Sequence, residues 1–147
     1  MKQEIRIKKL SEKATIPTYG SEFSAGADLY ALVEGTLTIK PHETVLVHTG
    51  LSMEIPEGFG GFIFARSGLA SKKGLAPANK VGVVDADYRG EIMVALHNHS
   101  ELPVEISDGE RIAQIVFLPF LSAKFIESET LSETVRGKGG FGSTGTK

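Results

Sequence analysis

The sequence predicts an all-β domain of the sandwich, jelly-roll or barrel type. Short apolar stretches of strand length recur about every ten residues, and Gly, Pro or Asp separates each from the next. No stretch carries a sustained helical periodicity, so a fold of alternating strands and helices is not expected. The 147 residues suffice for one domain with a substantial buried core.

The first half of the chain carries five of these stretches. Residues 5–8 alternate apolar and charged side chains, which is the pattern of a half-buried strand. Turn-forming residues stand beside the next four, so that each is short and clearly bounded. These four cover residues 36–39, 45–49, 51–55 and 60–64.

The later elements are bounded in the same way. Residues 67–73 form the one stretch for which a turn or two of helix is expected. A strand is expected at residues 102–106, because a Ser-Asp-Gly turn follows it. Residues 112–117 form the most apolar strand, and Pro119 ends it.

Residues 82–92 hold two apolar runs joined by a crowded polar loop. This pattern predicts a β-hairpin in which Asp85 pairs with Glu91 and Val83 lies opposite Met93. An acid, an aromatic ring and a base at the tip of a rigid platform favour binding or catalysis. An ordinary solvated turn has a similar composition, so both readings stay open. The other polar residues of the loop are Asp87, Tyr88 and Arg89.

Two other segments could contribute to a site. Arg66, Ser67 and Gly68 offer a guanidinium, a hydroxyl and free N–H groups at the end of a strand. They form either an anion site or a surface ion pair beside a turn. Asp28 follows a run of small residues, which either admits a ligand or backbone closely or places the carboxylate as a turn cap.

Composition argues against several classes of protein. A net charge of -2 gives no basic excess for nucleic-acid binding, and the lack of cysteine removes disulfides and thiolate sites. His97 and His99 share one face of a strand, but no third ligand lies near in sequence, which argues against a metal site. There is no signal-peptide core and no run near the roughly 20 apolar residues of a membrane helix. We therefore expect a cytoplasmic protein without nucleic-acid or membrane partners.

Residues 127–147 differ from residues 1–126 in composition. They are rich in Ser, Thr, Glu and Gly and cannot bury enough apolar surface to become ordered alone. A β domain at 1–126 and a flexible Gly-rich C-terminal arm at 127–147 are therefore expected. Arg136, Lys138 and the glycine N–H groups would suit closure over phosphate oxygens, with Phe141 stacked on a ring. A plain disordered tail remains the alternative.

Five segments together resemble the sequence motifs of the trimeric dUTP diphosphatase (dUTPase) family. They stand in the family's order, so the resemblance spans nearly the whole chain. Any one of them is a weak signal, whereas five in register are specific. Ala65 and Glu110 depart from the usual residues without removing a functional group. The five segments are residues 25–30, 66–70, 82–90, 108–114 and 136–145.

The resemblance implies a β jelly-roll homotrimer with three active sites, each built from more than one subunit. It also implies hydrolysis of dUTP to dUMP and pyrophosphate, with Mg²⁺ bound on the triphosphate. This reaction would limit uracil incorporation into DNA and supply dUMP. A dCTP deaminase shares the fold but is disfavoured, because Gly68 stands where it has a second serine. A non-catalytic nucleotide sensor or a structural trimer is the alternative from another class.

The resemblance also assigns roles around the 82–92 loop. Asp85 would be the general base that activates water for in-line attack on the α-phosphorus. Tyr88 would pack against deoxyribose and exclude a ribose 2′-OH. The backbone would pair with the uracil edge and reject the amino group of cytosine. The residues of this uracil pocket would be Asn79, Gly82, Val83, Val84 and Met93.

The remaining roles concern phosphate and metal. Asp28 would support the water shell of Mg²⁺. The C-terminal arm would close over the nucleotide, with Phe141 stacked on uracil. The residues expected to contact phosphate or to belong to this arm are Arg66, Ser67, Gly68, Gln114, Arg136, Gly142, Ser143 and Thr144.

Overall fold

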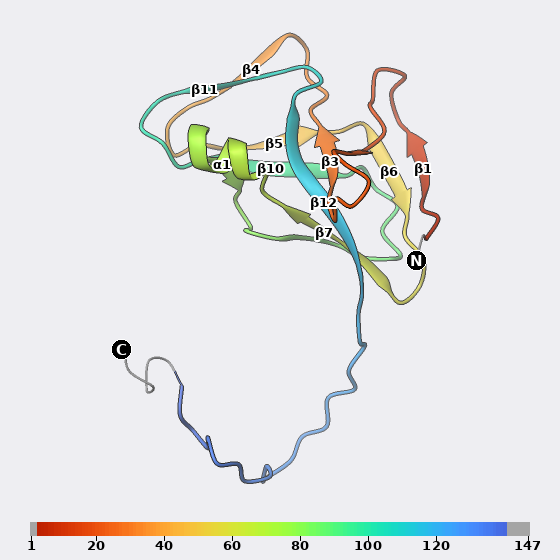
Figure 1. Ribbon diagram of the computed structural model, residues 1–147, viewed down its shortest axis with the longest axis vertical. Coiled ribbons are helices and arrows are strands. Elements are labelled where there is room, and N and C mark those ends of the chain that lie inside the picture. Colours follow the sequence, from red (N-terminus) through yellow and green to blue (C-terminus); the bar gives the residue numbers. More distant parts are fainter. Residues whose placement is uncertain (1–2, 141–147) are drawn as a thin grey trace.

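The computed structural model of the chain describes residues 3–140 and confirms the all-β prediction (Figure 1). Within this range, all paired strands are antiparallel and a single short helix, α1 (Ser67–Lys73), is present. The strands are β1 (Arg6–Lys9), β2 (Thr18–Tyr19), β3 (Ala27–Tyr30), β4 (Thr36–Ile39), β5 (Thr44–His48), β6 (Leu51–Glu54), β7 (Phe59–Phe64), β8 (Leu75–Pro77), β9 (Gly82–Val84), β10 (Met93–Asn98), β11 (Val104–Ser107) and β12 (Arg111–Pro119).

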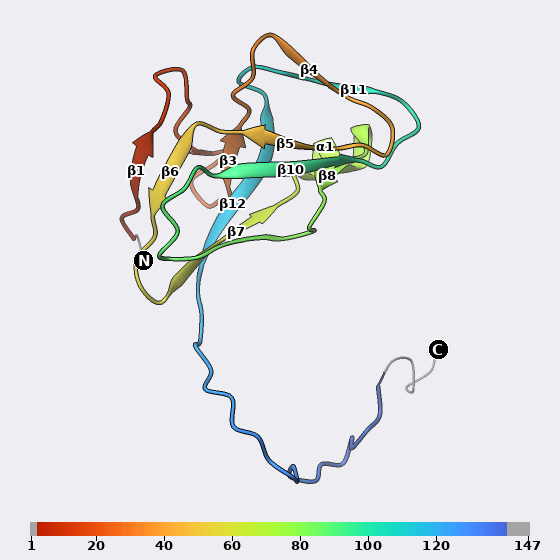
Figure 2. The same cartoon turned by 180° about the vertical axis from the view of Figure 1, so that it is seen from behind.

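The strands form two main layers. A five-stranded sheet has the order β2-β3-β12-β7-β9, and a three-stranded sheet has the order β5-β10-β8. β12 crosses in front of β5 and β10 in Figure 1 and behind them in Figure 2, so the two sheets face each other. Two smaller pairs, β1-β6 and β11-β4, complete the described body.

The core lies between these layers. Along β10, Val94 and Leu96 are buried, whereas Met93, Ala95 and His97 are partly exposed. This alternation follows from the two-residue period of a strand, which turns every second side chain inward. Leu29 and Ile115 are fully buried from the opposite sheet. Removal of these side chains from water supplies the main driving force for packing one layer on the other.

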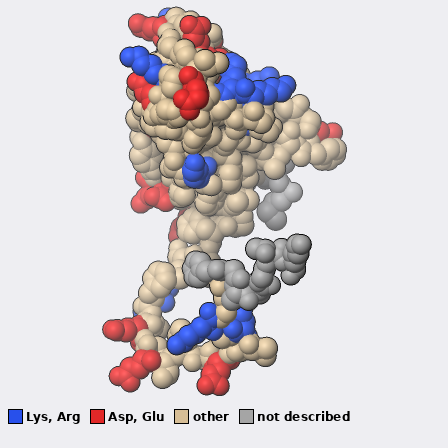
Figure 3. Space-filling view, turned by 90° about the vertical axis from the view of Figure 1, so that its left-hand side faces the viewer, with Lys and Arg blue, Asp and Glu red and all other residues tan. Residues whose placement is uncertain are grey.

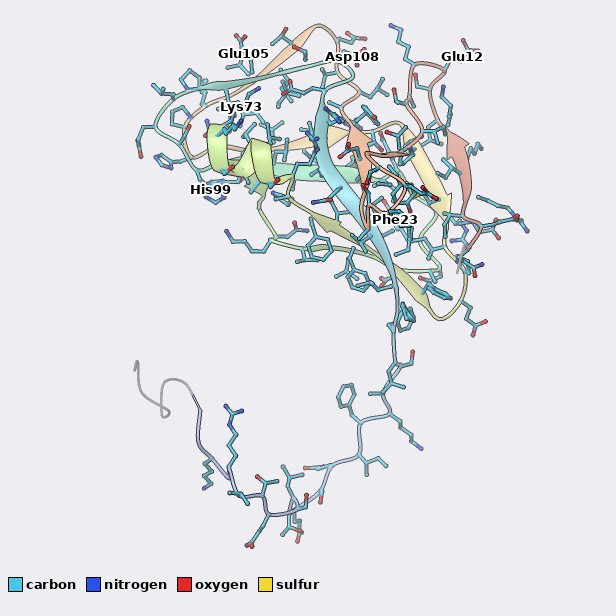
Figure 4. The ribbon with its side chains drawn as sticks, viewed as in Figure 1. Glu12, Phe23, Lys73, His99, Glu105 and Asp108 are labelled. Atoms are coloured by element: carbon cyan, nitrogen blue, oxygen red, sulfur yellow. The ribbon has the colours of Figure 1, made fainter. Side chains whose placement is uncertain are left out.

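The helix predicted at residues 67–73 is confirmed with the same bounds. It buries Leu69 and ends at Gly74, which adopts the left-handed conformation at φ 69°. Glycine is favoured there because a side chain would be strained at positive φ. Lys73 in the last turn donates to a carboxylate oxygen of Glu110 at 3.1 Å, and Figure 4 shows Lys73 on this helix. Arg66 directly precedes the helix in an extended conformation.

The hairpin predicted across residues 82–92 is wrong. β9 pairs with β7, where Val83 lies opposite Phe62, and β10 pairs with β5, where Met93 lies opposite His48. Val83 and Met93 therefore do not face each other in a ladder, and Asp85 does not pair with Glu91. The two arms separate because each completes a different sheet. The polar loop between them crosses from one layer to the other.

Residues 120–140 follow the last strand and contain no helix or strand. Figures 1 and 2 show this segment leaving the body of the molecule. The large apolar side chains near its start are exposed, with Leu121 at 90% and Phe125 at 94%. The division at residue 126 and the closure of residues 127–147 over a site stay predictions.

Candidate active site

A pocket of about 240 Å³ lies where the loop after β9 meets the start of β10. It brings together seven residues that the sequence predicted for the general base and the nucleotide-binding pocket. These are Asn79, Gly82, Val83, Val84, Asp85, Tyr88 and Met93. Leu46, Ile63, Glu91 and Ile92 complete the lining and were not predicted for the site. The pocket therefore forms although the predicted hairpin does not.

Burial alternates along β9 and the residue after it. Val84 is buried, whereas Val83 is 63% exposed and Asp85 is also exposed. A Cβ at Gly82 would lie 3.3 Å from the Cβ of Ile63 and 3.4 Å from Nδ2 of Asn79. Glycine therefore allows these two side chains to approach the backbone of β9 closely.

β9 is the last strand of its sheet. Its other edge has no strand partner among residues 3–140. The N–H and C=O groups on such an edge are available to a ligand. No described residue donates a hydrogen bond to the Asp85 carboxylate, which leaves it available to water at the pocket mouth.

Tyr88 is fixed by its own loop. Its backbone N–H donates to the carbonyl of Asp85 at 3.1 Å, and its hydroxyl donates to the carbonyl of Glu91 at 2.9 Å. A Cβ at Gly90 would collide with the Tyr88 ring, so glycine gives the ring room to lie over the backbone. Tyr88 remains 43% exposed, and its ring presents an apolar surface beside Asp85.

Glu91 ties this loop to the turn between β5 and β6. Its two carboxylate oxygens bond Nδ1 of His48 at 2.9 Å and the backbone N–H of Gly50 at 2.8 Å. Partial burial raises the pKa of Glu91, but the bonds from His48 and Gly50 and the charge of His48 outweigh it. The net pKa therefore lies below its usual value of 4.5.

A Glu91→Gln change is expected to lower the free energy of unfolding at pH 7 by about 1 kcal/mol, because a charged acceptor becomes a neutral one. The carboxylate's contribution is present above the unfolded pKa and is lost as the pH falls through the lower folded pKa. Urea unfolding at one protein concentration should show a difference between the two proteins that narrows below pH 4.5. A difference independent of pH would contradict this assignment.

A second polar cluster lies on β3 and β12 and just beyond the end of β7. One Asp28 oxygen accepts from Nε of Arg66 at 2.8 Å, and the other accepts from a terminal nitrogen of Arg111 at 3.3 Å. The Asp28 side chain is only 13% exposed, and that of Arg66 is 28% exposed. Charge-assisted bonds of this kind are strong and directional, so Asp28 holds the Arg66 guanidinium in one orientation.

Gln114 belongs to the same cluster. In the register of the sheet it lies between Asp28 on β3 and Phe64 on β7. Its side-chain N–H donates to the carbonyl of Ala65 at 2.9 Å. A Cβ at Gly26 would collide with the Gln114 side chain, which explains why a small residue precedes Asp28 here.

One chain does not bring all the predicted residues together. Asp28, Arg66 and Gln114 do not line the pocket that holds Asp85, and Ser67 and Gly68 lie exposed at the start of α1. Arg136 donates to the carbonyl of Gly139 at 2.8 Å, within the C-terminal segment. The last four predicted positions, Phe141, Gly142, Ser143 and Thr144, lie outside the described residues.

The described residues fit a metal carried by a substrate better than a resident one. No group of three His, Asp or Glu side chains among residues 3–140 could hold a metal ion. Each Asp28 oxygen has a guanidinium partner and keeps a second lone pair, which can accept from one water of a metal shell. Mg²⁺ commonly retains several waters and binds through phosphate, so this limited donor set is adequate.

His97, on β10, and His99, just beyond its end, make local contacts. Nδ1 of His97 is 2.8 Å from the Thr44 hydroxyl, and the rings of His97 and His99 are 4.4 Å apart. Loss of hydration lowers the pKa of His99, and the positive charges of His97, Lys80 and His42 lower it further. Figure 4 shows His99 beside α1.

The wider surface carries both signs of charge. Figure 3 shows acidic and basic side chains mixed on the face that it presents, over the body and along the C-terminal segment. None of the helices in the described chain is long and apolar enough to cross a membrane.

Among the residues near the two clusters that the sequence did not assign to a site, Leu46, Glu91 and Arg111 were missed for three different reasons. Leu46 is a strand residue like many others, and its place at the pocket follows only from the pairing of β5 with β10. Glu91 was placed opposite Asp85 in a hairpin and was given no role of its own. Arg111 stands within residues 108–114, so the motif itself was the signal that could have identified it.

Comparison with known proteins agrees with this geometry. The dUTPase family model matches residues 12–145. A deoxyuridine 5′-triphosphate nucleotidohydrolase from Desulfitobacterium hafniense is 50% identical over 146 residues, which cover 99% of this chain and 97% of the relative. The corresponding protein from a Hydrogenobaculum species is 48% identical, covering 98% and 99%.

Solved structures give the same result. A mutant dUTPase of Staphylococcus bacteriophage 80alpha, with dUpNHpp, superposes with a TM-score of 0.90 at 27% identity. The match covers 98% of this chain and 99% of the phage chain. The range matched by the family model, residues 12–145, contains the residues of the pocket and of the arginine cluster described above. The chain therefore belongs to the dUTPase family.

Proposed function

We propose that the protein hydrolyses dUTP to dUMP and pyrophosphate. The observation that carries this proposal is the pocket in which an accessible carboxylate, Asp85, stands beside the ring of Tyr88 and the free backbone edge of β9. In one pocket, the carboxylate can bind a water molecule, the apolar ring can pack against a sugar, and the backbone edge can form hydrogen bonds with a base. The names and the extent of similarity of the relatives support dUTP as the substrate.

In this mechanism Asp85 is the general base. Its carboxylate is ionised at neutral pH and accepts a proton from the water that attacks the α-phosphorus in line with the leaving pyrophosphate. The bond from water oxygen to phosphorus forms as the bond from phosphorus to the bridging oxygen breaks. The exposed position of Asp85 leaves room for water on its pocket side.

Selection of dUTP over dCTP and UTP would depend on two parts of the same pocket, the backbone of β9 and the ring of Tyr88. The uracil edge would pair with backbone groups of β9, while the amino group of cytosine would bring a donor where an acceptor is needed. The Tyr88 ring would pack against deoxyribose and leave no space for a 2′-OH. Its hydroxyl is already bonded to Glu91, which keeps the ring in place.

The arginine cluster is the proposed triphosphate site. Arg66, oriented by Asp28, supplies N–H donors, and Gln114 lies beside it on the neighbouring strand. Mg²⁺, bound to the triphosphate, would neutralise charge at the phosphates. Asp28 would hold one of the metal's waters. Phosphoryl transfer depends mainly on positioning and charge neutralisation, which these residues provide.

A trimer with shared sites would unite the two clusters. Within one chain the residues of the Arg66 cluster do not line the Asp85 pocket. A neighbouring copy would therefore supply its Arg66 cluster to the Asp85 pocket of this chain. Exposed apolar residues after β12 support such an association, because burial between copies would remove them from water. These residues are Phe120 at 47%, Leu121 at 90%, Phe125 at 94% and Ile126 at 77% exposed. Residues 127–147 would then close over bound nucleotide.

The test is to incubate purified protein with dUTP and Mg²⁺ and to assay for dUMP and pyrophosphate, with dCTP and UTP in parallel. We expect both products from dUTP, and turnover of dCTP and UTP lower by at least about a hundredfold. Formation of a uracil nucleotide from dCTP would instead identify a deaminase. Tight nucleotide binding without cleavage would leave a sensor.

A further inference from the structure

The carboxylate of Glu91 lies beside the proposed active site but has no role in the proposed mechanism. Its side chain lines the pocket of Asp85 and also an outer cavity of about 440 Å³, which His48 and Gly50 line as well. The carboxylate is 23% exposed and has partners on both oxygens, at Nδ1 of His48 and the N–H of Gly50. A glutamate held so closely beside a reaction site can transmit the position of one element to another.

The turn that holds Glu91 is itself firmly placed. Gly50 has a φ of 66°, and a Cβ there would lie 2.6 Å from Cδ2 of Leu32 and 2.9 Å from the Cβ of Ala14. Its carbonyl accepts from the N–H of Leu10 at 2.7 Å, and the carbonyl of His48 accepts from the N–H of Leu32 at 2.8 Å. The turn is therefore packed against neighbouring segments and can serve as a fixed support.

Other bonds between the same two segments act together with Glu91. The Ser52 hydroxyl donates to the carbonyl of Arg89 at 2.7 Å, and the Thr49 hydroxyl donates to the carbonyl of Ile92 at 2.6 Å. The N–H of Ile92 donates to the carbonyl of Leu51 at 2.7 Å. Residues 89–92 are thus attached to residues 48–52 along their length, and the Glu91 carboxylate adds its contact with His48 to bonds that otherwise involve only neutral groups.

The attachment leads directly to the nucleotide pocket. The backbone carbonyl of Glu91 accepts from the Tyr88 hydroxyl, and the N–H of Tyr88 donates to the carbonyl of Asp85. We propose that Glu91 is a positioning residue, which sets the Tyr88 ring and the Asp85 loop through its hold on His48 and Gly50. This inference rests on the proposed function. In this role Glu91 influences sugar selectivity through the position of Tyr88.

The test compares kcat/KM for dUTP with kcat/KM for UTP in wild type, Glu91→Ala and Glu91→Gln. Glu91→Ala should lower the dUTP-to-UTP ratio about tenfold, because a displaced Tyr88 excludes the 2′-OH less well. Glu91→Gln keeps an acceptor for Gly50 and should stay within about threefold of wild type. A merely structural role would lower stability and leave this ratio unchanged.

The chain offers a matched control in Glu101, which pairs with His42 at 3.1 Å on an exposed surface. Glu101→Ala removes the same chemical pair and should leave the ratio unchanged. If Glu91→Ala does not fold, the same ratio of kcat/KM is measured in Glu91→Asp. It keeps the charge but is one methylene too short to reach both partners, so the ratio should fall about fivefold. An unchanged ratio in a folded Glu91→Ala or Glu91→Asp variant would overturn the proposal.

A second measurement separates this proposal from the proposed function. The aromatic NMR signals of Tyr88, recorded without nucleotide, report the position and order of its ring. They should shift and broaden in Glu91→Ala and stay unchanged in Glu101→Ala. If wild type does not cleave dUTP, the function is wrong, while these signals still decide the role of Glu91. Unperturbed Tyr88 signals in Glu91→Ala would exclude a positioning role.

Discussion

An Asp85→Asn variant is expected to lower kcat for dUTP by about a thousandfold, with nucleotide binding nearly unchanged. The amide has the size and shape of the carboxylate but cannot accept a proton from water at neutral pH. Because Asp85 is exposed and its carboxylate accepts no hydrogen bond from a described residue, its replacement should leave the fold intact. Binding is best measured by calorimetry with a non-hydrolysable dUTP analogue and turnover by pyrophosphate release.

Asp87 provides the control for this variant. It lies in the same loop and is exposed, but it does not line the pocket that holds Asp85. Asp87→Asn therefore changes the net charge of the loop by the same amount and should keep turnover within about twofold of wild type. If Asp85→Asn retained turnover within tenfold of wild type, or if Asp87→Asn lost as much, Asp85 could not be the general base.

The strands were predictable where their pattern is local. Residues 36–39 are bounded by turn residues on both sides and form β4 with the same bounds, and α1 also matches its predicted range. β3 was not predicted as a strand, because its central residues include Asp28. That carboxylate is buried only because Arg66 and Arg111 come from distant parts of the chain to neutralise it.

The hairpin error shows what local pattern cannot supply. Two apolar runs joined by a short polar loop do favour pairing with each other, but the partner of a strand is chosen by the whole sheet. Here β9 pairs with β7, where Val83 lies opposite Phe62, while β10 pairs with both β5 and β8. This choice has a functional consequence. A paired hairpin would have occupied the backbone edge of β9 that the proposed mechanism assigns to uracil.

The candidate site was predictable to the extent that motifs mark chemistry. Seven residues that line the Asp85 pocket were predicted from the sequence, and among them Asn79 and Met93 do lie with Asp85. The contacts that hold the loop of Asp85 in place were not predictable from the sequence in the same way. Glu91 gains its partners from the turn between β5 and β6, about forty residues earlier in the chain, so no local pattern records the contact.

An Arg66→Ala variant is expected to lower kcat/KM for dUTP by about a hundredfold, because a guanidinium that Asp28 holds in place is lost from the proposed triphosphate site. Arg66→Lys keeps the charge but loses the planar fork and should lower kcat/KM about tenfold or more. Arg6→Ala is the control and should have no measurable effect, since among the described residues Arg6 forms an ion pair only with the exposed Glu54, at 3.1 Å.

The affinity for product separates phosphate binding by Arg66 from a purely structural pairing with Asp28. If Arg66 contacts the triphosphate, Arg66→Ala should weaken binding of a non-hydrolysable dUTP analogue far more than binding of dUMP, which lacks two of the phosphates. If Arg66 only neutralises Asp28, both ligands should weaken alike, and the double variant Asp28→Asn with Arg66→Ala should regain activity, because no buried charge is then left unpaired. We expect the first pattern and no recovery in the double variant, since removing Asp28 cannot restore the N–H donors that the phosphates have lost.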